Sequence, residues 1–103
     1  DHLRNHGFIL VPQGWVLAPA YDMNPNPHGD GLTLNISESD NAQDLGLVHD
    51  VAPFFRIKPA RAREVVTEVL AAVAGWREVA ENHGISRLEQ EQVAPAFRLA
   101  NRT

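Results

Sequence analysis

Apolar and polar residues follow two different spacings along this chain, one before residue 37 and another from residue 44 onward. Near the N-terminus, the apolar runs Phe8-Ile9-Leu10-Val11 and Trp15-Val16-Leu17-Ala18 flank the residues Pro12-Gln13-Gly14. Short β-prone runs separated by a few residues that include Pro and Gly are typical of a β-hairpin. We therefore predict two antiparallel strands, at about 8–11 and 15–18.

The next segment, residues 19–31, contains three prolines, two glycines and two asparagines. So many helix- and strand-breaking residues predict a long loop, and loops of this length are usually either functional or disordered. Residues 32–36 then alternate apolar and polar side chains, which predicts a short third strand.

From residue 44 the apolar residues recur at helical spacing, which predicts about three helices, at 44–55, 59–83 and 87–100. Asp44 is a suitable N-cap for the first helix, and Gly84 a suitable C-cap for the second. Ser86-Arg87-Leu88-Glu89 has the form of a capping box that opens the third helix. The sequence thus predicts an α+β fold, mainly α.

The second predicted helix carries one broad apolar stripe, which we expect to be buried. Trp76 and Phe97 are expected in the core, whereas Arg61, Arg63 and Arg77 are expected to be solvated. We treat residues 1–103 as a single unit, with a ribbon region at 1–36 and a helical scaffold at 44–103. The stripe consists of Ala62, Val65, Val66, Val69, Leu70, Val73, Trp76 and Ala80.

Composition narrows the range of functions. The chain has 103 residues, a net charge of −4 and no cysteine. The acidic balance provides no basic field for nucleic acid or an anionic membrane, and the absence of cysteine excludes disulfides and thiolate zinc sites. No apolar run approaches the roughly 18 residues of a membrane span. We expect a cytoplasmic protein that binds neither nucleic acid nor membrane directly.

Asn5 and Asp22 lie on either side of the predicted hairpin. A protein can hold Mg²⁺ with few side chains, because the ion keeps several waters and takes phosphate oxygens from its substrate. Protein kinases use an Asn of the catalytic loop and an Asp beyond a short ribbon. Their acid–base Asp lies five residues before that Asn, a position that falls one residue before Asp1.

The blocks HLRNHGF and GW-x-L-x-P-A-YD-x-NP, with the tail W-REVA, GIS and APAFR, resemble the C-terminal part of HipA-type serine/threonine kinases. These kinases are toxins of bacterial toxin–antitoxin pairs. The resemblance covers essentially the whole chain, and it implies a segment of a protein-kinase-like C-terminal lobe. It also implies that the chain is a fragment. The general base and the ATP-binding elements would then precede Asp1.

The resemblance implies roles residue by residue. Asn5 and Asp22 match the Mg²⁺ ligands, and His2 is expected to contact the γ-phosphate of ATP. Tyr21 matches a position whose ring packs against the nucleotide's base. Four further residues are expected to position these groups or assist at the metal, namely Asp1, Arg4, His6 and Asn24.

The implied activity of the intact protein is transfer of the γ-phosphoryl group of ATP, with Mg²⁺, to a serine or threonine of a protein. The expected protein substrate is a translation component such as an aminoacyl-tRNA synthetase. The expected partner is a small DNA-binding antitoxin, which would make the DNA contacts. The fragment alone is expected to be inactive.

Two other interpretations remain open at this point. The chain could be a catalytically inactive kinase-like module or a helical interaction domain. It could also be a small metal hydrolase built on His2, His6, Asp22 and His28. Each site residue also has a purely structural interpretation, since Asn5 or Asp22 could cap a turn and Tyr21 could belong to the core. His28 and Asp30 are expected to be solvated.

Overall fold

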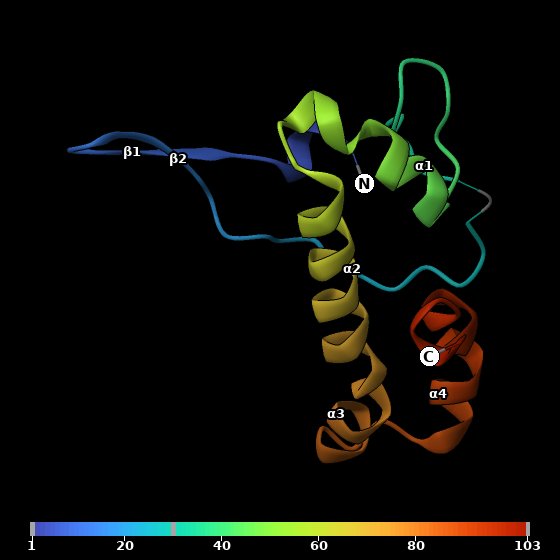
Figure 1. Cartoon of the computed structure of the whole chain (residues 1–103). Helices are drawn as coiled ribbons and strands as arrows, with labels where there is room; N and C mark the ends of the chain where they lie inside the picture. The colour runs from blue at the N-terminus through green and yellow to red at the C-terminus, as the bar shows by residue number, and fades with distance from the viewer. Residues whose placement is uncertain (1, 30, 103) are drawn as a thin grey trace.

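The computed structural model describes residues 2–29 and 31–102, and it shows a β-hairpin followed by helices (Figure 1). The predicted α+β, mainly α, fold class is confirmed. Strand β1 (Phe8–Val11) pairs antiparallel with β2 (Gly14–Leu17). Gly14 has φ 121°, a conformation that side-chain-bearing residues rarely adopt, so the turn depends on glycine. The hairpin is confirmed, with its second strand one residue earlier than predicted.

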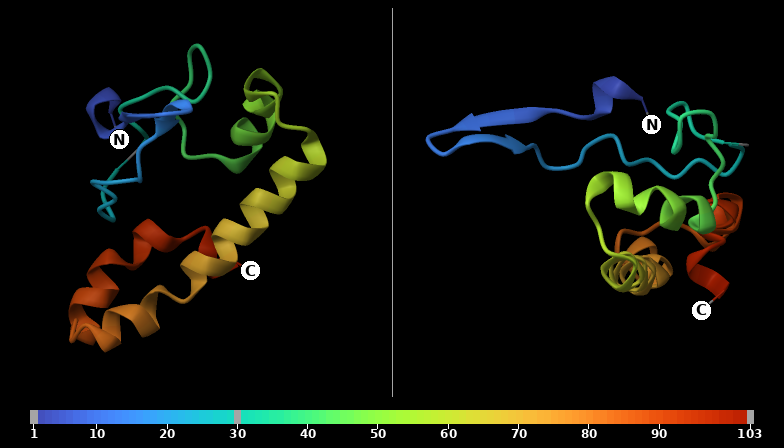
Figure 2. Two further views of the ribbon diagram at one scale, coloured as in Figure 1. Left: turned by 90° about the vertical axis from the view of Figure 1, so that its left-hand side faces the viewer. Right: turned by 45° about the horizontal axis from the view of Figure 1, so that its top comes forward.

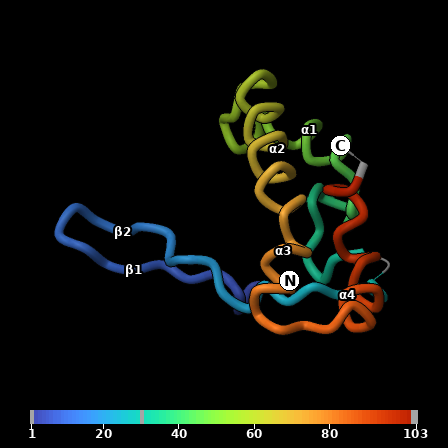
Figure 3. Tube along the Cα trace, turned by 90° about the horizontal axis from the view of Figure 1, so that it is seen from below, coloured from blue at the N-terminus to red at the C-terminus, as the bar shows by residue number. Residues whose placement is uncertain are grey.

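The hairpin projects away from the helices (Figure 1, Figure 2 and Figure 3). Its apolar side chains are exposed on both faces, for example Phe8 (66%) and Trp15 (70%) on one face and Ile9 (47%) on the other. At its base, the Ala18 N–H donates to the Gly7 carbonyl at 2.8 Å and continues the pairing beyond the strands. The hairpin therefore brings the segments just outside it, including Asn5 and Asp22, into proximity.

The predicted strand at 32–36 is wrong. The Leu32 N–H donates to the Asn41 carbonyl (2.9 Å), and the Ile36 N–H donates to the Asp40 carbonyl (2.7 Å). These bonds close a local loop, so the N–H groups of Leu32 and Ile36 are satisfied without a partner strand. The side chains still alternate between half-buried and exposed from Leu32 to Ile36, which explains why the pattern resembled a strand.

The first predicted helix, 44–55, consists of α1 (Leu45–Val51) and the 3₁₀ helix η2 (Ala52–Phe55). Asp44 is the N-cap, as predicted, because its Oδ1 accepts from the backbone N–H of Gly46 and Leu47. Pro53 lies in the first turn of η2, where its missing N–H is tolerated.

The second predicted helix, 59–83, is not continuous. It is divided at Gly75 into α2 (Pro59–Ala74) and α3 (Trp76–Asn82). Glycine is among the poorest helix formers, which accounts for the break. Gly84 ends α3 with φ 75°, and the Ile85 N–H returns to the Ala80 carbonyl at 3.0 Å. This is the predicted C-cap, in the form of a Schellman motif.

The third predicted helix, 87–100, is likewise not continuous, and consists of α4 (Arg87–Val93), η3 (Ala94–Phe97) and η4 (Ala100–Arg102). The capping box is confirmed, since the Ser86 N–H donates to Glu89 Oε2 (2.9 Å) and the Glu89 N–H to Ser86 Oγ (3.3 Å). Hydrogen bonds from the Ser86 hydroxyl and N–H lower the pKa of the Glu89 carboxyl. The chain then returns toward α2, against which η4 packs (Figure 1).

The core is small and lies among α2, α3 and the C-terminal helices. Trp76 stacks on Phe97 with a centroid separation of 4.2 Å, so both are core residues as predicted. Val65 and Val69 are exposed, contrary to the predicted stripe, because no described segment covers that face of α2. The described residues classed as buried are Ala52, Ala62, Trp76, Ala80, Gln90 and Ala100.

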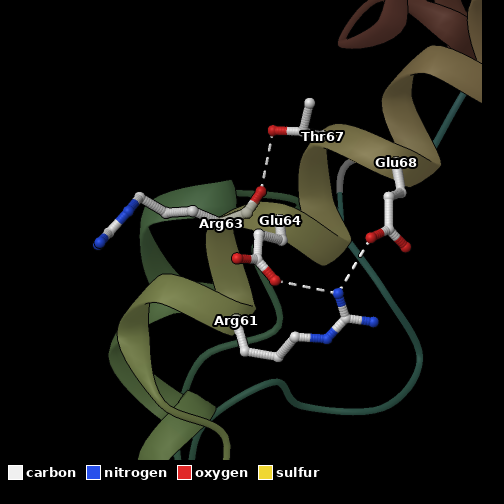
Figure 4. A network of polar contacts seen from close by, with 5 residues as sticks. All are labelled: Arg61, Arg63, Glu64, Thr67 and Glu68. Carbon is white, nitrogen blue, oxygen red and sulfur yellow. Dashed lines mark hydrogen bonds and ion pairs between the residues drawn. The ribbon is translucent and has the colours of Figure 1, made fainter.

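The arginines on the helix faces differ in their exposure and in their partners. Arg61 forms ion pairs with Glu64 and Glu68, at 3.1 and 3.0 Å, on the exposed face of α2 (Figure 4). These carboxylates raise the pKa of the Arg61 guanidinium. Arg77 was expected to be solvated, but it is half-buried, with its guanidinium 4.5 Å from the Trp76 ring centroid. Residues 2–29 and 31–102 contain no helix that is long and apolar enough to cross a membrane.

Candidate functional site

The site begins with a single 3₁₀ turn, η1 (Leu3–Asn5), which precedes the hairpin. The Asn5 N–H donates to the His2 carbonyl at 2.9 Å. In return, the His2 N–H donates to Asn5 Oδ1 at 3.0 Å. These reciprocal bonds fix both the backbone and the side-chain amide of Asn5, leaving its Nδ2 group available to another segment.

That other segment contains Asp22. Asn5 Nδ2 donates to Asp22 Oδ2 at 2.6 Å, a contact between residues 17 positions apart. Asn24 Nδ2 donates to the other carboxylate oxygen, Oδ1, at 2.8 Å. Asp22 has φ 56°, in the left-handed region that Asp and Asn tolerate better than most residues. Both carboxylate oxygens are therefore oriented by amide groups.

Tyr21 makes a second connection between the same two segments. Its hydroxyl donates to the Arg4 carbonyl at 2.5 Å, while its side chain remains 48% exposed. Nothing in the sequence pattern indicated a bond between these two residues. The role implied for the Tyr21 ring, packing against a nucleotide base, stays a prediction.

His2 and His28 differ in burial and in their hydrogen bonds. His2 is half-buried, and its Nδ1 is buried without a hydrogen-bond partner among the described residues. His28 is exposed in the long loop, where its backbone N–H donates to Asn26 Oδ1. Within residues 2–29 and 31–102, no three His, Asp or Glu side chains are grouped so that they could hold a metal ion. The hydrolase interpretation built on His2, His6, Asp22 and His28 therefore lacks its ligand cluster.

Two positions named in the sequence analysis, Asp1 and Asp30, lie outside the described residues. The positioning role expected for Asp1 and the solvation expected for Asp30 consequently stay predictions.

A cleft of about 810 Å³ opens beside Asn5 and Asp22. Its lining also includes residues of the C-terminal region, where Arg98 Nη2 donates to Oε1 of the loop residue Gln43 at 2.9 Å across 55 residues. Sequence reasoning missed both Gln43 and Arg98, because no local pattern relates a loop residue to a residue so far along the chain. The cleft is lined among others by Tyr21, Asn24, Leu32, Gln43, Val73 and Arg98.

The donor set suits a magnesium ion that also has phosphate and water ligands. Mg²⁺ prefers oxygen donors and needs only one or two from the protein. Asp22 would supply a carboxylate and Asn5 an amide oxygen, and the two side chains are in contact through Asn5 Nδ2 and Asp22 Oδ2. The adjacent cleft falls within the range of volumes typical of small-molecule sites.

A hairpin that joins an amide and a carboxylate beside a cleft defines a candidate two-segment ligand-binding site. The family model of the HipA-like C-terminal domain matches residues 1–76, well over half of the chain. The chain belongs to this family. The match includes the hairpin, the long loop, α1 and α2, and it ends at the first residue of α3. Comparisons with curated proteins and with solved structures give no significant match.

Proposed function

We propose that this chain is the C-terminal segment of a HipA-like serine/threonine kinase that transfers the γ-phosphoryl group of ATP to a protein hydroxyl. The observation that carries the proposal is the 2.6 Å contact between Asn5 and Asp22, which lies inside the family match. An asparagine of the catalytic loop and an aspartate beyond a short ribbon are the protein's share of a kinase magnesium site, and the contact places this pair side by side.

Catalysis of phosphoryl transfer depends mainly on positioning and on electrostatic stabilisation. When bound, Mg²⁺ would supply the positive charge that offsets the phosphate oxygens. Asn5 Oδ1 and the Asp22 carboxylate are the atoms that would hold it. His2, two residues beyond the expected base, would contact the γ-phosphate. An aspartate just before Asp1 would orient the attacking serine or threonine hydroxyl.

The family resemblance also supports a biological context. In the proposed context the intact kinase is the toxin of a bacterial toxin–antitoxin pair and works in the cytoplasm. Its partner is a small DNA-binding antitoxin, and its target is a protein such as an aminoacyl-tRNA synthetase. The net charge of −4 agrees with DNA being contacted by the partner rather than by this segment.

A second candidate function is a module without catalytic activity of its own. It is favoured by the exposed apolar side chains of the hairpin, such as Phe8 and Trp15, which are suited to contact another polypeptide. The two proposals are compatible, because the segment on its own would be inactive and the intact kinase active.

The proposal is tested by Asp22→Asn in the intact kinase. Asparagine keeps the side-chain shape and tolerates the φ of 56°, so the variant removes the charge and one of the two acceptor oxygens to which Asn5 and Asn24 donate. We expect phosphoryl transfer to fall by at least about 100-fold, in line with the loss of a transition-state electrostatic contact. The measurement is transfer of labelled γ-phosphate to a protein substrate at saturating ATP and Mg²⁺.

Asp50→Asn is the matched control, because Asp50 is an exposed residue of α1 that does not line the cleft. It should leave the rate unchanged. Full activity in Asp22→Asn would contradict the proposed magnesium site and leave the non-catalytic module as the better interpretation.

A further inference from the structure

The further inference concerns the hydroxyl group of Tyr21, and it rests on the proposed function. The hydroxyl donates to the Arg4 carbonyl at 2.5 Å. Arg4 and Asn5 are consecutive, as are Tyr21 and Asp22. The tyrosine bond is therefore one residue away, in both segments, from the 2.6 Å bond between Asn5 and Asp22.

Two adjacent hydrogen bonds constrain the relative position of the two segments more than one hydrogen bond could. A single hydrogen bond would leave the two segments free to rotate about it, whereas two bonds at successive residues fix their relative orientation. A third bond, from the Ala18 N–H to the Gly7 carbonyl at 2.8 Å, lies where the hairpin begins. The three bonds join the segments before and after the hairpin, from the base of the hairpin to Asp22.

The three bonds would not respond alike to a cation. An amide N–H cannot ligate a metal, and the carboxylate oxygen that accepts it is one that a metal would use. The bond between Asn5 and Asp22 therefore competes with ligation. The bond between Tyr21 and Arg4 contains no candidate ligand atom, so it can persist when the carboxylate is engaged.

We infer that Tyr21 is a positioning residue whose hydroxyl, by holding the Arg4 carbonyl, keeps Asn5 and Asp22 at the spacing that Mg²⁺ requires. This role belongs to the hydroxyl. It differs from packing of the ring against a nucleotide base, and the two roles can be separated by substitution. Outer groups that orient metal ligands contribute to metal affinity without touching the metal.

The test uses the intact kinase and compares Tyr21→Phe, which removes only the hydroxyl, with Tyr21→Leu, which also removes the ring. Metal affinity is measured directly, from Mn²⁺ binding by electron paramagnetic resonance in the presence of a non-hydrolysable ATP analogue. The half-saturating Mg²⁺ concentration for phosphoryl transfer, the KM for ATP at saturating Mg²⁺ and the melting temperature are measured in parallel.

Tyr21→Phe is expected to weaken Mn²⁺ binding on the order of 10-fold, as is typical for loss of an outer-shell partner. It should raise the half-saturating Mg²⁺ concentration by a similar factor. Excess Mg²⁺ should restore kcat, and the KM for ATP at saturating Mg²⁺ should not change. This separation between metal affinity and ATP affinity would not arise from a general loss of structure.

Three outcomes would overturn the inference. The first is unaltered Mn²⁺ affinity in Tyr21→Phe with a raised KM for ATP in Tyr21→Leu, which would assign the role to the ring. The second is a fall in kcat that excess Mg²⁺ does not restore, together with a lower melting temperature. The third is normal Mn²⁺ affinity in Asp22→Asn, which would contradict the proposed function as well. If Asp22→Asn weakens Mn²⁺ binding and Tyr21→Phe does not, only the role of Tyr21 is contradicted.

Discussion

Individual side chains in this protein act mainly by orienting backbone and carboxylate groups at the ends of segments. Asp44, Ser86 and Glu89 do so at helix starts, and Asn5 and Asn24 do so around Asp22. The helix caps could be predicted because they depend on residues three or fewer positions apart. The contacts of Tyr21 with Arg4 and of Arg98 with Gln43 could not, since only the folded chain brings those residues together.

The capping box provides a prediction at this scale. Hydrogen bonds from Ser86 lower the pKa of Glu89 below its ordinary value of 4.5. Because the folded-state pKa is depressed, the interaction stabilises the start of α4 above the unfolded-state pKa. That stabilisation is lost as the pH falls through the folded-state value. We expect an NMR titration of the Glu89 side-chain carboxyl carbon to give a midpoint below 4.5.

Ser86→Ala is the control for that titration. It removes the hydroxyl that donates to Glu89 Oε2 at 2.6 Å while leaving the backbone N–H in place. The midpoint of Glu89 should therefore move upward, and the free energy of unfolding should fall by about 1 kcal/mol, as for other N-cap losses. An unchanged midpoint would show that the backbone donor alone sets the pKa.

At the scale of elements, the sequence predicted where segments begin better than how far they extend. The hairpin was predicted within one residue, because Pro12-Gln13-Gly14 favours a turn between the two apolar runs; the turn consists of Pro12 and Gln13, and Gly14 begins β2. The helix at 59–83 was predicted as continuous because its apolar spacing does not change at Gly75. The backbone nevertheless breaks there, since periodicity reports which face is apolar and not the conformation of each residue.

The two glycines around α3 give a matched prediction. Gly75 has φ −79° and room for a Cβ, whose nearest neighbour would be the Ala72 carbonyl at 3.9 Å. Gly75→Ala should therefore raise the free energy of unfolding by about 0.4 to 1 kcal/mol, because alanine restricts the unfolded chain. Thermal and urea unfolding followed by circular dichroism measure the change.

Gly84→Ala is the opposite case, because Gly84 has φ 75° but nothing within 4 Å of the added Cβ. It should lower the free energy of unfolding by roughly 1 to 2 kcal/mol through backbone strain alone. Equal effects of the two substitutions would contradict the assignment of Gly84 as the left-handed C-cap.

At the scale of the whole molecule, the chain exposes more surface than a protein of its size usually does. Its accessible surface is 8381 Å², whereas a typical monomeric protein of the same mass exposes roughly 5,800 Å². Its radius of gyration is 15.8 Å, compared with roughly 13 Å for a compact domain of this length. The two-sided hairpin contributes to this surplus, and a lone two-stranded hairpin is only marginally stable in water. We therefore expect another part of the proposed intact kinase to cover it.

The two tryptophans allow that expectation to be measured, because Trp15 on the hairpin is 70% exposed and Trp76 in the core is 9% exposed. In Trp76→Phe, emission comes from Trp15 alone, and iodide should quench it strongly in the isolated chain. In the intact kinase the same residue should become blue-shifted and protected, since burial removes its indole from water. Trp15→Phe is the control, and its remaining Trp76 should be protected in both proteins. Equal quenching of Trp15 in the isolated chain and the intact kinase would mean that the hairpin stays uncovered and the surplus surface has another purpose.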